Sequence, residues 1–278
     1  VVCEEMQEFF KEKVDKIYSE MDKYDSAIGD RSQDITPDFE GTVWTEFQPV
    51  SEEELKQVLS ELNKKECEAD PIPIKLLLQV ISEVTPLIHF IVNDSLKRGV
   101  FPDCIKNALV RPVIKDENGD INSLKNYRPI SNLPFVSKIL EKCVQRQLVK
   151  HLEVNELHAM HQSGYRANHS CETATLTMYN DLLCISDLKN KVVLLLLDLS
   201  AAFDTVSHRI LLSKLKDKFG MSGDVLDWFR SYLDGRSFTV TIEKSKSKGC
   251  ILKIGVPQGS ILGPILFILY TKDPEFIA

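Results

Sequence analysis

The chain has 278 residues, of which 43% are hydrophobic and 27% charged, and its net charge is −7. This size can bury one large core or two modest cores, and no apolar run reaches the roughly 18 to 20 residues that a membrane-spanning helix needs. We therefore expect a globular chain that has no membrane partner.

The negative charge is local. Residues 1–70 hold 20 acidic and 8 basic residues, whereas the rest of the chain holds 21 acidic and 26 basic residues. A mildly basic body is compatible with binding phosphate groups, although it is less basic than a dedicated nucleic-acid binder. The seven cysteines are scattered without a C-x-x-C pair. This odd number suits a reducing compartment, so we expect the nucleus or the cytoplasm rather than secretion.

The N-terminal part is expected to be helical and acidic. Apolar residues at helical spacing predict an amphipathic helix over residues 1–24, and the polar run 22–41 indicates a linker. Ser51 to Glu54 form a capping box that opens a helix to about Lys64. We expect residues 1–69 to form an N-terminal segment and residues 70–278 to form the main domain.

The next segments alternate between helix and strand. Residues 74–98 predict a largely apolar helix that Pro86 breaks or kinks. Residues 108–114 and 126–134 predict two extended pieces joined by a turn. Residues 134–152 then predict a helix whose basic face carries Lys138, Lys142, Arg146 and Lys150. That face either follows a nucleic-acid backbone or is simply solvated.

A short apolar run, Val192 to Leu197, is too continuous for a strand with one wet face. It predicts a strand buried on both sides that ends at Asp198. Asp204 is expected to cap the helix that follows, over residues 207–219. Residues 224–233 predict a further helix with core aromatic residues, and 237–243 with 249–256 predict a hairpin.

Residues 255–264 read G-V-P-Q-G-S-I-L-G-P and precede a predicted helix over residues 261–270. The glycines on either side of Pro-Gln permit the backbone to approach another group closely. On residue types alone, this stretch is either a nucleotide-contacting loop or an ordinary turn between strand and helix.

Three stretches together resemble one family. D-L-S-A-A-F-D-T-V at 198–206, G-V-P-Q-G-S-I-L-G-P at 255–264 and N-Y-R-P-I-S-N-L-P at 126–134 resemble the reverse transcriptases of non-LTR (LINE-type) retrotransposons, closest to the jockey-like branch. The resemblance implies that Asp198 and the Leu199 carbonyl hold catalytic Mg²⁺. It also implies that Phe203 excludes a 2′-hydroxyl by its bulk.

Further site residues follow from the same resemblance. Lys115 and Arg128 are expected to contact the triphosphate, since Arg engages phosphate oxygens with two donors. Gln258 and Gly259 are expected beside the incoming nucleotide. The template-binding residues are expected to be Arg166, with Lys138 and Lys142 from the basic helix.

The implied fold is an α+β right-hand polymerase, represented by fingers and a partial palm, with the thumb absent. The implied partners are an RNA template, a DNA primer and deoxynucleoside triphosphates. The family's Tyr/Phe-x-Asp-Asp motif is missing from the sequence, and two-metal catalysis needs further carboxylates. We therefore expect a truncated RNA-directed DNA polymerase that does not polymerise as these 278 residues. The alternative is a non-catalytic retrotransposon relic that binds nucleic acid or protein.

Overall fold

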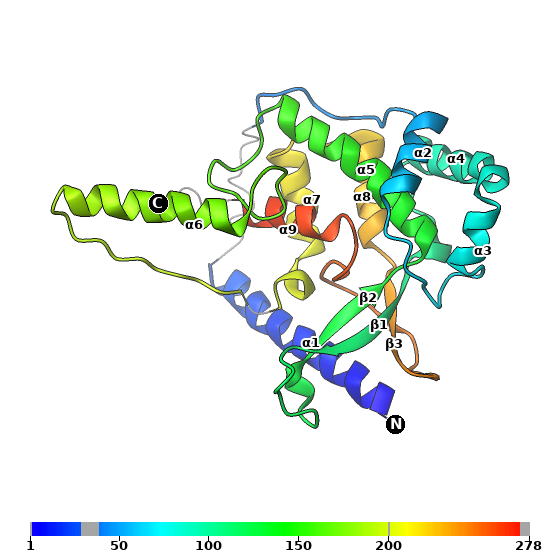
Figure 1. Cartoon of the computed structure of the whole chain (residues 1–278), viewed down its shortest axis with the longest axis horizontal. Helices are drawn as coiled ribbons and strands as arrows, with labels where there is room; N and C mark the ends of the chain where they lie inside the picture. The colour runs from blue at the N-terminus through cyan, green and yellow to red at the C-terminus, as the bar shows by residue number, and fades with distance from the viewer. Residues whose placement is uncertain (1, 29–38, 200, 273–278) are drawn as a thin grey trace.

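A computed structural model describes residues 2–28, 39–199 and 201–272. The chain folds as an α+β structure in which a small sheet lies between a long N-terminal helix and a group of packed helices (Figure 1). Its helices are α1 (Val2–Ile28), α2 (Glu52–Glu61), α3 (Ile74–Gln79), α4 (Ile81–Arg98), α5 (Phe135–Val154), α6 (Cys171–Asp187), α7 (His208–Asp217), α8 (Gly223–Leu233) and α9 (Gly263–Thr271).

Within the described residues, five strands form the sheet: β1 (Asn107–Ile114), β2 (Tyr127–Asn132), β3 (Ser237–Ile242), β4 (Ser245–Lys246) and β5 (Cys250–Ile251). β1 pairs antiparallel with β2 and parallel with β3, and β3 pairs antiparallel with both β4 and β5. The two predicted extended pieces and the predicted hairpin are therefore confirmed. The return strand of that hairpin is shorter than expected.

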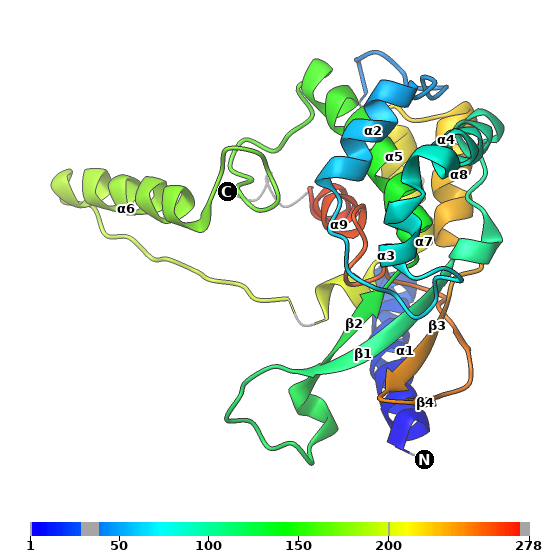
Figure 2. The ribbon, with the colours of Figure 1, turned by 45° about the vertical axis from the view of Figure 1, so that its right-hand side comes forward.

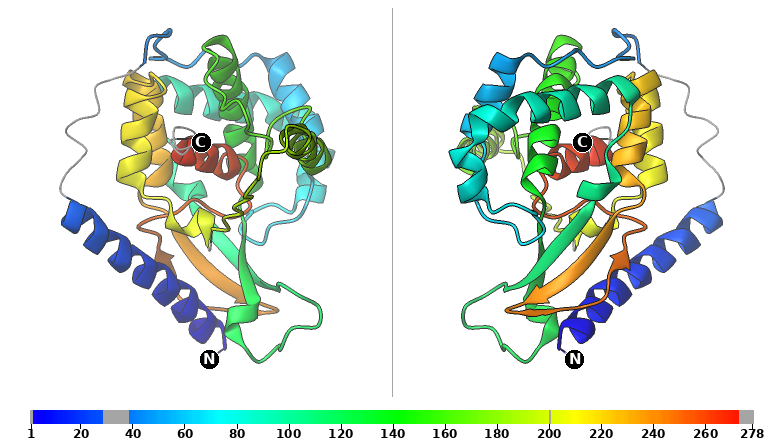
Figure 3. Two further views of the ribbon diagram at one scale, coloured as in Figure 1. Left: turned by 90° about the vertical axis from the view of Figure 1, so that its left-hand side faces the viewer. Right: turned by 90° about the vertical axis from the view of Figure 1, so that its right-hand side faces the viewer.

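The predicted N-terminal helix is confirmed as α1, which runs along one side of the sheet (Figure 3). Its Met6 and Phe10 are buried against Val110 of β1 and Val240 of β3. These contacts form a small apolar cluster separate from the main core. Helix α1 thus covers a sheet face that would otherwise expose β-branched residues to water.

The main core lies among the helices. Trp228 and Tyr232 of α8 stack with ring centroids 5.5 Å apart, and Phe101 packs edge-on against both rings. This confirms the prediction that the aromatic residues of 224–233 are core residues. Phe47 and Leu55, which lie before residue 70, belong to the same core. Helix α2 carries the predicted capping box between Ser51 and Glu54.

Two helix boundaries differ from the prediction. The helix expected over 74–98 is interrupted at Val80, and Pro86 lies inside α4. Pro86, the sixth residue of α4, removes one helical hydrogen bond without ending the helix. The predicted cap of α7 is also wrong, since Ser207 accepts the hydrogen bond from Ile210 N and Asp204 lies in a short 3₁₀ turn.

The largest correction concerns Val192 to Leu197. This segment forms no strand, and it runs with α6 as an arm that projects from the body (Figures 1 and 2). Val193 is 93% exposed and Leu197 is 82% exposed. A strand buried on both faces needs neighbouring strands and covering layers. Within the described residues none of the strands pairs with this segment, so its apolar side chains remain in solvent.

Candidate functional site

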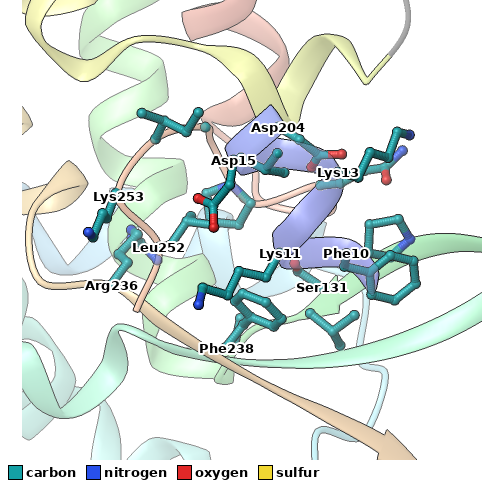
Figure 4. Close-up of a pocket in the computed structure, with 18 of the residues that line it drawn as sticks. Phe10, Lys11, Lys13, Asp15, Ser131, Asp204, Arg236, Phe238, Leu252 and Lys253 are labelled. Atoms are coloured by element: carbon teal, nitrogen blue, oxygen red, sulfur yellow. The ribbon is translucent and has the colours of Figure 1, made fainter. Parts of the chain in front are cut away.

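A cavity of about 630 Å³ lies between α1, the sheet and the loop that precedes α9 (Figure 4). Its charged lining residues are mostly basic: Lys11, Lys13, Lys16, Lys106, Lys115, Lys125, Arg236 and Lys253. Most of the uncharged lining is apolar, including Phe9, Phe10 and Phe238. Its acidic lining residues are Glu12, Asp15 and Asp204. An excess of positive charge around a partly enclosed space favours an anionic ligand.

Gln258, one of the predicted nucleotide contacts, lines this cavity. The backbone of its loop is fixed against β2, because Ser131 N donates to Gln258 O at 2.8 Å. Gly259 adopts a φ of +122°, and a Cβ there would lie 2.4 Å from Ser131 O. The sequence therefore needs glycine at 259 so that this loop can approach another strand, which is a different reason from the nucleotide contact we expected.

The Phe203 segment lies directly beside the same loop. Val256 N donates to Phe203 O and Gly255 N donates to Val206 O, both at 2.8 Å. Gly255 has a φ of +85°, and a Cβ there would lie 2.8 Å from Asp204 O. Two stretches about 50 residues apart in sequence are thus held together by backbone contacts. The Phe203 ring packs against Phe267, with the ring centroids 5.3 Å apart.

Lys115 also lines the cavity, at the end of β1. Partial burial, together with the charges of Lys13 and Arg128, lowers its pKa. Arg128 itself is exposed and is not among the cavity residues. Because Tyr127 and Pro129 line the cavity and strand side chains alternate, Arg128 lies on the opposite face of β2. The structure therefore brings one of the two predicted triphosphate residues to the cavity.

Asp204 faces the cavity from the short turn after Phe203. Burial raises the pKa of its carboxyl to about 6, and the nearby Lys13 opposes that rise. A carboxyl in this state changes charge near neutral pH, although sequence reasoning had given it only a capping role.

The sequence model of one family, described as reverse transcriptase (RNA-dependent DNA polymerase), matches residues 114–275. The chain belongs to the reverse transcriptase family. The matched residues include Lys115, at the end of β1, and the loop that carries Gln258.

Curated relatives agree with this assignment. The chain is 29% identical over 226 residues to the RNA-directed DNA polymerase from mobile element jockey of Drosophila funebris, covering 81% of this chain and 24% of that protein. It is 30% identical over 229 residues to the probable RNA-directed DNA polymerase from transposon X-element of Drosophila melanogaster, covering 82% and 25%.

A more distant relative is the Pol polyprotein from type-1 retrotransposable element R2 of Popillia japonica, at 24% identity, covering 80% of this chain and 30% of that protein. The chain spans about a quarter of the length of the jockey and X-element relatives. The expected resemblance to non-LTR reverse transcriptases of the jockey-like branch is confirmed, and the relic alternative is not favoured.

The predicted metal ligands do not reach the cavity. Asp198 and Leu199 lie in the exposed segment after α6 and are not among the cavity residues. In the part of the chain that the structure describes, no group of three or more His, Cys, Asp or Glu side chains could hold a metal ion. A two-metal centre needs carboxylates that bridge both ions, so the described arrangement does not by itself fit one.

The predicted template residues lie away from the cavity and have partners in the protein. Arg166 donates to Ala159 O at 3.3 Å, which holds its own loop. Lys138 donates to Asn132 Oδ1 at 3.2 Å, and Lys142 pairs with Glu61 of α2 at 3.8 Å. The basic face of α5 is thus partly neutralised by α2. A template role for these three residues stays a prediction.

Sequence reasoning missed two groups of residues. The first is the lysines of α1, which had been assigned to an acidic N-terminal segment but line the cavity. The second consists of two buried charged residues, Glu141 of α5 and Arg236 after α8. A signal for Glu141 was present, because it occupies the apolar face of its helix between Leu140 and Val144. None of the described helices is long and apolar enough to cross a membrane.

Proposed function

We propose that this chain forms the fingers and part of the palm of a non-LTR retrotransposon RNA-directed DNA polymerase. Such an enzyme extends a DNA 3′-hydroxyl on an RNA template. One observation carries the proposal: Lys115, Asp204 and Gln258, which lie far apart in the part of the sequence that matches the family, line one cavity. A deoxynucleoside triphosphate is the anionic substrate that this site fits.

Each part of the cavity has a task in this proposal. Lys115, at the end of β1, neutralises the triphosphate, which favours its binding and the departure of its β- and γ-phosphates as pyrophosphate. Gln258 lies against the base or sugar, together with the bare backbone of Gly259. Phe203, one residue before the cavity residue Asp204, excludes a ribose 2′-hydroxyl by its bulk.

The metal site belongs to the same proposal. We take Mg²⁺ as the ion and Asp198, with the Leu199 carbonyl, as its ligands in this chain. For these groups to serve the bound nucleotide, the exposed segment 192–199 has to move to the cavity. Held by these groups, the ion would supply charge stabilisation at the transferring phosphoryl group.

The remaining partners are nucleic acids. We propose that Arg166, Lys138 and Lys142 contact the template, and that Arg128, whose charge already acts on Lys115, adds to the positive charge near the triphosphate. These basic side chains can exchange a protein partner for a phosphate oxygen where the protein contact is exposed and therefore weak. We place the protein in the nucleus or the cytoplasm, in a complex with RNA.

Photochemical labelling with a nucleotide tests the proposed function. The chain is mixed with a poly(rA)·oligo(dT) hybrid and irradiated with radiolabelled dTTP. We expect Lys115→Ala and Gln258→Ala each to reduce labelling by about tenfold, which corresponds to the loss of one charge-assisted or buried contact. Lys97→Ala is the matched control, because Lys97 is an exposed α4 lysine outside the cavity. If Lys115→Ala, Gln258→Ala and Lys97→Ala were all labelled as strongly as the wild type, the proposal would be refuted.

A further inference from the structure

Glu141 is a fully buried carboxyl in the middle of α5. Its Oε2 accepts hydrogen bonds from the backbone amides of Ile261 and Leu262, at 2.7 and 3.2 Å. Its Oε1 accepts from Ser137 Oγ at 3.1 Å. Both oxygens are therefore satisfied, and one of them is committed to the backbone of another segment.

The segment that Glu141 holds is the loop that carries Gln258. Ile261 and Leu262 directly precede α9, so their amides lie at the positive end of that helix, where a carboxylate is stabilising. Within the loop, Ser260 Oγ donates to Pro257 O and accepts from Gly263 N, both at 2.9 Å. The loop is thus a compact unit fixed at its far end by Glu141.

The near end of the loop is fixed by β2. Ser131 N donates to Gln258 O at 2.8 Å, as described above. Residues 257–262 are therefore held between two anchors, one on a strand and one on a helix. If either anchor is lost, the direction of the Gln258 side chain at the cavity is free to change.

The surroundings of Glu141 account for a carboxyl in this core. Burial raises its pKa, while the Arg236 charge, the two amides and Ser137 oppose that rise. Arg236 is itself buried, with its guanidinium carbon 4.0 Å from the centre of the Tyr232 ring. Either protonation state keeps the loop bonds, because a protonated carboxyl can donate through Oε1 and still accept through Oε2.

We propose that Glu141 is a positioning residue for the incoming nucleotide: it anchors the 257–262 loop at the start of α9 and so keeps Gln258 at the cavity. This inference rests on the proposed function for its last step. Its first step, the anchoring of the loop, is independent of any substrate.

Three substitutions separate anchoring from general stability. Glu141→Gln keeps an acceptor oxygen for the two amides and offers an amide donor to Ser137, so we expect it to keep the loop contacts, although it removes the charge that acts on Arg236. Glu141→Met fills the same space and removes both acceptors. Val144→Ala is the matched control, since Val144 is fully buried one turn along the same helix. It weakens the core without removing a bond to the loop.

Amide hydrogen exchange measured by NMR tests the anchoring step. We expect exchange at Ile261 and Leu262 to become about tenfold faster in Glu141→Met than in Val144→Ala, and to stay near wild type in Glu141→Gln. Equal protection in the Met and Ala variants would overturn the proposal. If Glu141→Met does not fold, Glu141→Asp gives the same test, because it withdraws the carboxylate from the loop by one methylene group.

The dTTP-labelling assay tests the positioning step. We expect the apparent dissociation constant for dTTP to rise several-fold in Glu141→Met and to stay unchanged in Glu141→Gln and Val144→Ala. A rise of the same size in Val144→Ala would overturn the positioning role. Absence of labelling in the wild-type chain would refute the proposed function and, with it, the last step. Exchange at the two amides would still decide whether Glu141 anchors the loop.

Discussion

The amide of Val256 donates a hydrogen bond to the carbonyl of Phe203 at 2.8 Å. This bond joins the segment proposed to select the sugar to the loop proposed to contact the base. A second backbone hydrogen bond, from Gly255 N to Val206 O, joins the same two segments. Because both bonds are between backbone groups, the two segments keep their relative position whatever side chains occupy the cavity.

Gly259 is the position where the loop tolerates least change. We expect Gly259→Ala to lower the free energy of unfolding by at least about 2 kcal/mol, because the alanine combines a positive φ with a clash against Ser131 O. Urea denaturation measures the effect. Gly249→Ala is the control, since a Cβ at 249 meets no atom within 4 Å. Equal stabilities of the two variants would contradict the described loop conformation.

Asp204 makes the stability of the protein dependent on pH. Burial raises the pKa of its carboxyl from 3.8 to about 6, so the folded protein holds this proton more tightly than the unfolded chain. Its contribution to stability is therefore present below about pH 4 and is lost as the pH rises to about 6. Asp204→Asn removes this dependence.

Urea denaturation of both proteins between pH 4 and pH 7 checks the Asp204 prediction. We expect the wild type to lose on the order of 2–3 kcal/mol relative to Asp204→Asn over that range, from the shift of about two pKa units. If the free energies of unfolding of the two proteins changed in parallel with pH, Asp204 would have an ordinary pKa in the folded protein.

Local patterns in the sequence predicted most of the elements. The capping box at Ser51 and the aromatic face around Trp228 both appear as expected. Each of these depends on residues within a few positions of one another. The positions of Lys115 and Gln258 at one cavity were predicted through the family resemblance, because no local pattern brings β1 and the 255–259 loop together.

The errors arise where long-range contacts decide. Val192 to Leu197 has the composition of a buried strand, but burial depends on neighbouring strands that the pattern does not specify. Lys13 lay in a segment whose periodicity predicted a helix but not its packing partner. Glu141 reads as a surface residue by type, and only the tertiary position of the Ile261 amide makes its burial favourable.

Phe203 provides a test of sugar selection. We expect Phe203→Ala to reduce the preference for dUTP over UTP in the labelling assay by roughly tenfold, because a smaller side chain leaves room for the 2′-hydroxyl. Phe203→Tyr keeps the bulk and is expected to keep the preference. Unfolding measurements on both variants account for the lost packing against Phe267. An unchanged preference in the Ala variant would mean that another residue selects the sugar.

Lys13 tests whether α1 contributes to the site or obstructs it. Burial is the main cause of the lowered pKa of Lys115, and the charge of Lys13 lies close enough to lower it further. Two like charges held together in this way are stabilised by an anion between them. We therefore expect Lys13→Ala to raise the pKa of Lys115 towards its ordinary value and to reduce dTTP labelling several-fold.

NMR of isotopically dimethylated lysines follows the pKa of Lys115, and photochemical labelling follows the nucleotide. Lys65→Ala is the control for loss of an exposed lysine outside the cavity, and we expect it to change neither quantity. Increased labelling in Lys13→Ala would contradict the prediction. It would mean that α1 competes with the triphosphate for Lys115, since removing its charge would then relieve a repulsion or a blockage rather than remove a contact.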